Sequence, residues 1–519
     1  MPASSAFSEP PARQSLNSHT ATAVLGPDRK REQKLTLIIL LIAGSVRIPW
    51  LWRGFGGHPD EWYLIRSGLD LWLNGIYQPS RPAGFPLNEI MMAGLAWLGG
   101  APACAAAATA ASLAALVYMR WLAPLHGIAD SFWLVLAFSF EPWFWSSGAH
   151  DLDYAWGVLA LLAAIYYAER RRFGRAGLAC GLGFGFRPTS VLWIAPVFLR
   201  VASVERDWQG VLRFGLCAAT AALVPASLIL WWIIAAKSEA FGGIGWQFSM
   251  VTQVVRHPVA APALAGYRLI ELIGHIPALL VITAACHVNR DRLLGLFRSR
   301  QAWVWTYVLI FVLLLIPFIS LSEKPEHMLP ALPGLFMILG RCISNAWWKA
   351  MTAAFVLNAF VSFGFGHVGH TAALSLDLAQ PSLRPGVLLW YAERAKASNE
   401  LVARAGSELS EPSRIIRAGP GSIHLDPFYV SALLERGPSS QAHISCPLIP
   451  GRLSSRDGTH LEISPSQGLP GPTPSYYPLL VCCASNSAVI TSGPPESWEE
   501  ELKAAIPRFC GKDKDTATD

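Results

Sequence analysis

Long apolar blocks separated by short polar loops run from about residue 35 to about residue 367 of the chain. The blocks are about 17–25 residues long, the length that a helix needs to cross a hydrocarbon core of about 30 Å. The first is Leu35–Trp52, and no block of this length follows Phe365. The pattern therefore predicts an all-α polytopic membrane protein with about eleven transmembrane helices.

The polar segments at either end divide the chain into three parts. Residues 1–34 are a polar tail, residues 35–367 are the membrane domain, and residues 368–519 are a water-soluble domain. Only Trp390 and Trp498 of the 21 tryptophans follow residue 367. Short apolar patches amid proline and glycine in the last part predict a small α/β or mostly irregular domain. Its four cysteines could pair in three ways in an oxidising space; they are Cys446, Cys482, Cys483 and Cys510.

Composition excludes a soluble enzyme, because 52% of the residues are apolar and only 15% are charged, against about 25% charged in soluble proteins. The net charge of +6 comes from lysines and arginines in short loops and indicates orientation, with no nucleic-acid partner. Basic runs at 29–34, 169–175 and 290–300 are expected on the cytoplasmic side. The N-terminus would then be cytoplasmic, and the soluble domain extracytoplasmic together with the loops 53–83, 146–152, 237–267 and 321–327.

Two apolar blocks are predicted to be irregular. Three blocks, 84–99, 103–123 and 131–147, separate two loops that belong on the same side, so one of them cannot cross. The shortest, Pro86–Leu98, carries Asn88 and Glu89 near its start and is expected not to span. Arg187-Pro188 interrupts the apolar stretch 176–199 and predicts a broken helix or a hairpin.

An acidic pair follows the first span directly, in His58-Pro59-Asp60-Glu61. Paired acids near lipid are costly unless they are solvated, paired or used. The apolar positions after Pro59 suit a helix lying along the membrane interface, with Asp60 at or near its N-cap. The alternative is that Asp60 is only a cap and that Glu61 is a solvated surface charge.

Further motifs on the outer side give this pair a context. Gly75-Ile76-Tyr77 leads to a proline-rich return into the membrane, Arg81–Leu87, and a second acidic loop lies at Glu141–Asp153. A third segment is Ser322–Pro333. In this order the motifs resemble the GT-C superfamily of membrane glycosyltransferases over about residues 35–367. His327-Met328 departs from the Arg-Tyr pair that is common in the family.

The resemblance implies transfer of a sugar, with inversion, from a polyprenyl-phosphate donor to a lipid, glycan or protein acceptor outside the membrane. By the match, Asp60 would be the general base and Glu61 a supporting acid. Asp151 and Asp153 are two residues apart and point in different directions, so we expect one of them to face the site and choose Asp151. Either could instead be the N-cap of the next helix. Some family members need a divalent cation such as Mg²⁺ or Mn²⁺, which these acids could bind; no cofactor is certain.

Four basic side chains are candidates for binding the donor phosphate: Arg81, Arg187, Lys324 and His327. Arg187 lies inside an apolar stretch, where an arginine usually faces a wet cavity or an ion partner; an intramembrane salt bridge is the alternative. Lys324 could simply be solvated beside its acidic neighbours. Arg47 lies near the outer end of the first span, could extend to the interface, and is not taken as a candidate. His58 and His150 could join the site or be ordinary loop residues.

Two other classes of function remain open. A transporter or lipid flippase would favour internal repeats and polar groups at the midplane, whereas the ionisable groups here collect in outer loops. A catalytically degenerate GT-C-like scaffold would keep the fold without activity. We expect a bacterial inner membrane and a periplasmic active site.

Overall fold

In the computed structural model of the chain, the described residues are 27–55, 59–75, 77, 79–81, 84–150, 153–205, 208–236, 259–287, 290–298, 301–320, 325–365, 381–393 and 395–396, with five short strands after residue 414. This part is mostly helical. Its α-helices in chain order are α1 Pro27–Ser45, α2 Pro59–Asn74, α3 Pro86–Leu125, α4 Phe132–Ser139, α5 Pro142–Ser147, α6 Tyr154–Glu169, α7 Phe173–Phe186, α8 Val191–Val204, α9 Trp208–Ala236, α11 Ala260–Ile273, α12 His275–His287, α13 Arg290–Arg298, α14 Ala302–Ser320, α15 Leu332–Gly340 and α16 Asn345–Phe360. Three short 3₁₀ helices are η1 Ile48–Trp50, η2 Pro188–Ser190 and η3 Pro325–Ala331.

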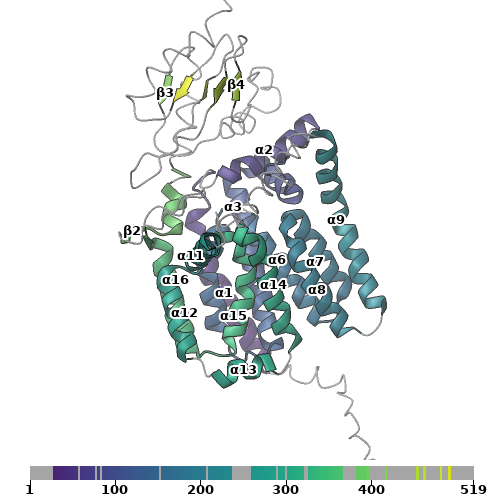
Figure 1. The fold of residues 1–519 in the computed structure, drawn as a ribbon, viewed down its shortest axis with the longest axis vertical. Coiled ribbons are helices and arrows are strands. Elements are labelled where there is room, and N and C mark those ends of the chain that lie inside the picture. Colours follow the sequence, from purple (N-terminus) through teal and green to yellow (C-terminus); the bar gives the residue numbers. More distant parts are fainter. Residues whose placement is uncertain are drawn as a thin grey trace, which may run out of the picture.

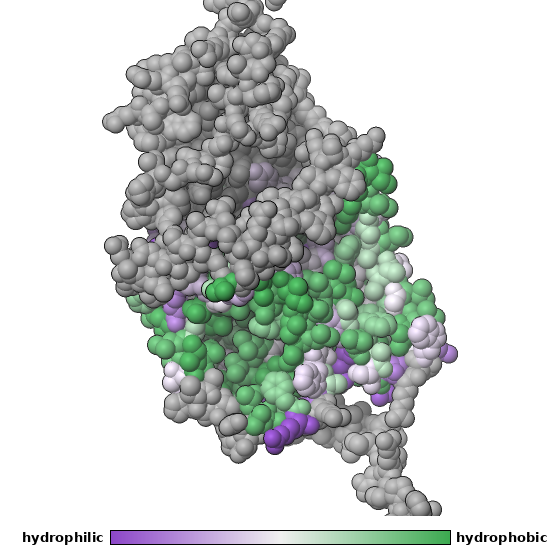
Figure 2. All heavy atoms as spheres, viewed as in Figure 1, coloured by the Kyte–Doolittle hydropathy of each residue, from purple (hydrophilic) through white to green (hydrophobic). Residues whose placement is uncertain are grey.

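Within the described residues, four helical stretches are long and apolar enough to cross a membrane: Lys30–Trp50, Pro86–Leu125, Trp208–Ile234 and Ala302–Ile319. A fifth candidate is the pair Ala261–Ile273 and His275–Ala284, which is bent by 96°. Figure 2 shows a broad hydrophobic band on the described surface, with hydrophilic residues near its lower edge. The helical membrane class predicted from the sequence therefore holds.

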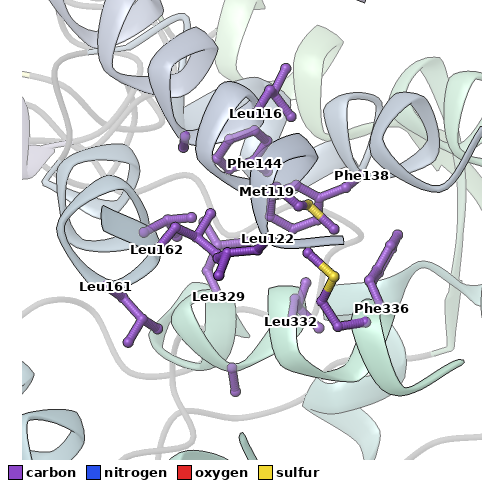
Figure 3. Packing of buried hydrophobic residues seen from close by; sticks show 14 of the residues in the cluster. Leu116, Met119, Leu122, Phe138, Phe144, Leu161, Leu162, Leu329, Leu332 and Phe336 are labelled. Carbon is purple, nitrogen blue, oxygen red and sulfur yellow. The ribbon is translucent and has the colours of Figure 1, made fainter. Parts of the chain in front are cut away.

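Apolar side chains from distant segments form the core between these helices. Leu122 of α3 lies beside Leu162 of α6 and Leu329 of η3 (Figure 3). The same cluster contains Leu116 and Met119 of α3, Leu161 of α6 and Leu332 of α15. Phe138 of α4 and Phe144 of α5 pack with rings 4.4 Å apart. Because α3, α6 and η3 meet here, the loops at the ends of these helices are held close together.

α3 is not a straight rod. Gly99 and Gly100 have non-helical dihedral angles, and Gly100 has φ +65°, which glycine adopts readily. Cys104 Sγ lies 3.3 Å from the Met92 carbonyl oxygen, whereas residues twelve apart in a straight helix are about 18 Å apart. The chain therefore turns sharply after Leu98, and its first arm, Pro86–Leu98, is only about 20 Å long. This agrees with the expectation that the block does not cross the membrane alone.

The predicted break at Arg187-Pro188 is confirmed. α7 ends at Phe186, Arg187 is extended with φ −153° and ψ 102°, and η2 then leads into α8. A proline cannot continue the hydrogen bonding of the preceding turn, and it disfavours helical geometry in the residue before it. The break leaves the Arg187 side chain at a helix end rather than on a lipid-facing helix surface.

The segment after α16 folds back onto the membrane helices. Strands β1 Val361–Phe365 and β2 Pro381–Pro385 form an antiparallel hairpin, and residues 387–393 are helical. Leu388 and Tyr391 are buried, at 0% and 1% exposed. Contacts between the predicted membrane domain and the predicted soluble domain thus include those of Gly386 with Phe360 and of Tyr391 with Trp143 and His150.

Five short strands are described in the last part of the chain: β3 Ile415–Arg417, β4 Arg452–Ser454, β5 His460–Glu462, β6 Leu480–Val481 and β7 Val489–Thr491. β7 lies between β3, to which it is parallel, and β6, to which it is antiparallel; β4 and β5 form a separate antiparallel pair. The α/β class of this domain stays a prediction. The four tail cysteines lie outside the described residues.

Candidate active site

The acidic pair lies in the first turn of α2, at the end of the bundle opposite α13 (Figure 1). Pro59 at the helix start and the two acids after it suit a helix N-terminus, where proline needs no donor and negative charge is favoured. Asp60 is 8% exposed and Glu61 is 1% exposed. Burial of Glu61 excludes its interpretation as a solvated surface charge.

Arg81 connects the first outer loop to the second. Its Nη1 donates to Asp60 Oδ2 at 3.1 Å, and its Nη2 donates to Asp153 Oδ1 at 2.9 Å. Its guanidinium also stacks 3.8 Å from the centroid of the Phe85 ring. One guanidinium therefore fixes the distance between two carboxylates that are far apart in the sequence.

Arg187 approaches the same carboxylate from the break between α7 and α8. Its Nη1 donates to Asp153 Oδ2 at 2.6 Å, and its Nε donates to Thr189 Oγ1 at 3.0 Å. The guanidinium lies 4.0 Å from the centroid of the Tyr154 ring. Asp153 occupies the N-cap position of α6, yet its side chain makes no capping hydrogen bond. Its two oxygens instead accept from two arginines.

Charge pairing dominates the electrostatics of this cluster. Burial alone would raise the pKa of the Asp153 carboxyl, but Arg187 and Arg81 outweigh burial and hold that pKa below its ordinary value. Burial likewise opposes the charge of Arg81, whereas Asp60 and Asp153 raise the pKa of its guanidinium above the ordinary value. The net shift of each pKa favours the charged form, so the cluster holds ionised groups in a buried place.

Glu61 faces a different neighbour. His150 Nδ1 lies 3.6 Å from Glu61 Oε1, and the His150 ring lies 4.8 Å from the Tyr391 ring. Burial, with a smaller contribution from the Arg53 charge, lowers the pKa of His150 to about 4. The imidazole is therefore neutral near pH 7, and Tyr391 of the returning segment packs on this side of the site.

The remaining sequence candidates fall into two groups. His327, in η3, stacks with Tyr154 at a ring distance of 6.3 Å, and Tyr154 in turn contacts Arg187. It thus lies one ring away from the cluster. Asp151, Lys324 and His58 lie outside the described residues, so their part in the site stays a prediction.

Arg47 does not extend to the interface, as it could have done from its place near the end of the first span. It is 0% exposed and donates to the carbonyl oxygens of Ala43 and Ser139, at 2.9 and 3.0 Å. Its position against α4 lets it satisfy carbonyl groups inside the bundle, which is more favourable than leaving them without donors. Arg47 therefore ties α1 to α4 and takes no part in the candidate site.

Another buried acid, Glu89, is a residue that sequence reasoning did not identify as part of the site. It lies in the first turn of α3, is 0% exposed and accepts hydrogen bonds from the loop that carries Arg81. The only feature of the sequence that marks Glu89 is its charge inside an apolar block. That charge indicated only that the block would not cross the membrane.

The described acids do not fit a metal centre. Among the residues that the structure describes, no group of three or more His, Cys, Asp or Glu side chains is arranged to hold a metal ion. The carboxylates of Asp60 and Asp153 accept from guanidinium groups, which compete with a cation for the same oxygens. We therefore derive no step through a metal.

No family model, no curated protein and no solved structure matches the chain. Two carboxylates and two guanidinium groups meet at one end of the bundle, joined by hydrogen bonds of 2.6–3.1 Å. A carboxylate can accept a proton, and guanidinium groups bind phosphate oxygens through paired N–H donors.

Proposed function

We propose that this chain is a membrane glycosyltransferase of the GT-C type. It transfers a sugar from a polyprenyl-phosphate donor to an acceptor at the extracytoplasmic face of a bacterial inner membrane. About eleven helices cross the bilayer in this proposal. The observation that carries it is the cluster of Asp60, Arg81, Asp153 and Arg187, which gathers three separate segments at one end of the bundle.

Asp60 is the general base. It takes the proton from the acceptor hydroxyl as the acceptor oxygen attacks the anomeric carbon. The bond between that carbon and the phosphate oxygen breaks on the opposite face, and its electron pair leaves with the lipid phosphate. One displacement of this kind inverts the anomeric configuration.

Arg81 and Arg187 stabilise the leaving phosphate. The phosphate gains a negative charge as the bond breaks, and preorganised cations lower the free energy of that transition state. Asp153 holds both guanidinium groups in place through its two oxygens. When the donor binds, Arg81 exchanges its bond to Asp60 for one to the phosphate, which leaves Asp60 free to accept a proton.

Burial at a membrane surface supports this assignment over a surface ion pair. Asp153 has a fully buried side chain, and the side chains of Arg187 and Arg81 are 5% and 18% exposed. Removing such charges from water is costly unless geometry or function compensates. The Arg290–Arg298 helix α13 lies at the other end of the bundle (Figure 1), as the expected orientation requires.

A donor screen tests the proposal. Full-length protein in detergent micelles is mixed with a panel of radiolabelled polyprenyl-phosphate sugars, and both released polyprenyl phosphate and labelled acceptor are measured. We expect both products to form together with one donor class. Movement of an intact lipid-linked sugar across a proteoliposome membrane, without cleavage of its phosphate bond, would contradict the proposal and identify a flippase.

A further inference from the structure

Glu89 accepts three hydrogen bonds from the loop that precedes α3. Tyr77 Oη donates to its Oε2 at 2.6 Å, and Ser80 donates to its Oε1 twice, from the backbone N at 2.8 Å and from Oγ at 2.6 Å. Tyr77 is 3% exposed and Glu89 is 0% exposed. A buried carboxylate with well-formed hydrogen bonds holds its donors firmly, because each broken bond would leave a buried polar group unsatisfied.

Ser80 donates two hydrogen bonds to Glu89, and Arg81 is the next residue along the chain. The position of Ser80 therefore fixes the start of the Arg81 backbone. The loop has little room to adjust on its other side. Gly84 has φ +74°, and a Cβ there would collide with Tyr77 Oη. Position and direction of the Arg81 backbone therefore depend on the carboxylate of Glu89.

The backbone of Glu89 also sets the position of α2. A Cβ on Gly68 would collide with the carbonyl oxygen of Glu89, so α2 approaches this turn of α3 as closely as a glycine permits. α2 carries Asp60 at its first turn. Both partners of the bond between Arg81 and Asp60 are thus held against the same residue, Glu89.

We propose that Glu89 is a positioning residue for sugar transfer, which acts by holding Arg81 between Asp60, Asp153 and the donor phosphate. This inference rests on the proposed function. Glu89 itself does not touch the reacting atoms. It is distinct from Asp60, because its hydrogen-bond donors in the loop are neutral groups, whereas Asp60 accepts from Arg81.

The neighbouring residue offers a matched control. Asn88 is also 0% exposed and lies on the same turn of α3, and its side-chain nitrogen and oxygen have no hydrogen-bond partner among the described residues. Glu89→Leu and Asn88→Leu therefore each replace a buried polar side chain by the same apolar one. Only the first removes bonds to the loop. Tyr77→Phe removes one of these bonds and serves as a milder variant.

Hydrogen–deuterium exchange of the full-length protein in micelles gives a readout that does not depend on activity. We expect exchange in the peptide covering residues 77–85 to rise about tenfold in Glu89→Leu, equivalent to about 1.4 kcal/mol. Tyr77→Phe should give a smaller rise, and Asn88→Leu should leave this peptide unchanged. Equal exchange in Glu89→Leu and Asn88→Leu would overturn the inference.

A double-mutant cycle with Arg81 tests the link to transfer. Glu89→Leu should lower kcat about tenfold or more, the factor that corresponds to about 1.4 kcal/mol, and should add no further loss to Arg81→Met, because both changes remove the same guanidinium from its place. Glu89→Gln keeps one oxygen for Ser80 and should restore most of the rate. Additive losses would contradict the positioning role. If the wild type transfers no sugar from any donor, the proposed function fails, and the exchange measurement still decides whether Glu89 holds the Arg81 loop.

Discussion

Two ion-pair clusters at opposite ends of α6 differ in how their charges are shared. Asp153 precedes the first residue of α6, and Glu169 is its last, so the two acids are separated by about 24 Å along the helix. Glu169 accepts from Arg200 at 2.8 and 2.7 Å, and its partner lies on α8. At the other end Asp153 divides its oxygens between Arg81 and Arg187, and Arg81 is shared again with Asp60.

This difference in charge sharing indicates that the Glu169 cluster is a structural ion pair and that the Asp153 cluster is a candidate site. One acid and one arginine in paired contact satisfy each other, which is sufficient to tie two helices. At the Asp153 end, two arginines bind two acids through three hydrogen bonds, and N–H donors remain because each guanidinium has five of them. Arg81 Nε, for example, is buried without a hydrogen-bond partner among the described residues. In the proposed function, the spare N–H donors of the Asp153 end bind the donor phosphate, and the Glu169 end has only a structural role.

The largest expected effect comes from removing the shared acid. Asp153→Asn leaves the buried Arg187 without its acid and Arg81 with Asp60 alone, and should lower the free energy of unfolding by about 3–5 kcal/mol. Glu169→Gln leaves one arginine, whose side chain is 15% exposed, and should cost about 1–3 kcal/mol. Thermal unfolding in micelles, followed by tryptophan fluorescence, measures both. Equal shifts would mean that the two clusters are of the same kind.

Acid pH should affect the two ends unequally. Burial lowers the pKa of His150 to about 4, so the folded protein stays unprotonated there while the unfolded chain binds a proton below about pH 6.5. Stability should therefore fall as pH decreases from 6.5 toward 4, by up to about 1.4 kcal/mol per pH unit, with no contribution above 6.5. Asp153 stays charged in this window, because its pKa is lowered.

Substitution of each histidine isolates this slope. His150→Asn should flatten the dependence of the melting temperature on pH. At the other end, burial also lowers the pKa of His126, but Glu169 partly offsets burial, so His126→Asn should flatten it less. A slope that survives in His150→Asn would show that another group is responsible.

How much of this arrangement the sequence could predict depends on whether neighbours along the chain or distant segments decide a residue's place. The break at Arg187-Pro188 follows from proline chemistry, and the charges of Asp60, Arg81 and Arg187 beside apolar blocks indicate a site. Asp153 was not preferred over Asp151, because the direction of each side chain depends on where α6 begins. That start is decided by the packing of α6, which no local pattern reveals.

Buried charges were the least predictable. Arg47 is satisfied by the carbonyl oxygen of Ser139, a group that lies far along the chain and becomes a neighbour only in the folded bundle. In the sequence, Glu89 is only a charge that interrupts an apolar block. Its hydrogen bonds with Tyr77 and Ser80 exist only in the folded protein. Such roles depend on tertiary contacts.

The smallest expected effects come from removing the hydroxyl groups that accept hydrogen bonds from Arg187 and Arg200. Thr189→Val removes the acceptor of Arg187 Nε, a bond of 3.0 Å, and should cost about 1 kcal/mol with a several-fold loss of transfer. Ser203→Ala removes an exposed contact of 3.4 Å to Arg200 and should change stability by less than about 0.5 kcal/mol. Unfolding and transfer assays on both variants measure the difference. If stability and transfer are unchanged in Thr189→Val, the bond to Thr189 does not orient Arg187.

Transfer by Asp60→Asn is the most direct test that the Asp153 end is a glycosyltransferase site. Membranes that carry the variant are assayed with labelled polyprenyl-phosphate sugars, beside wild type and Glu169→Gln at equal expression. We expect Asp60→Asn to lose about 10²–10⁴-fold of the rate, since the proton acceptor is gone, and Glu169→Gln to transfer at nearly the wild-type rate. Full turnover by Asp60→Asn would contradict the assignment of Asp60 as the base and, with it, the enzymatic function proposed for this end of the molecule.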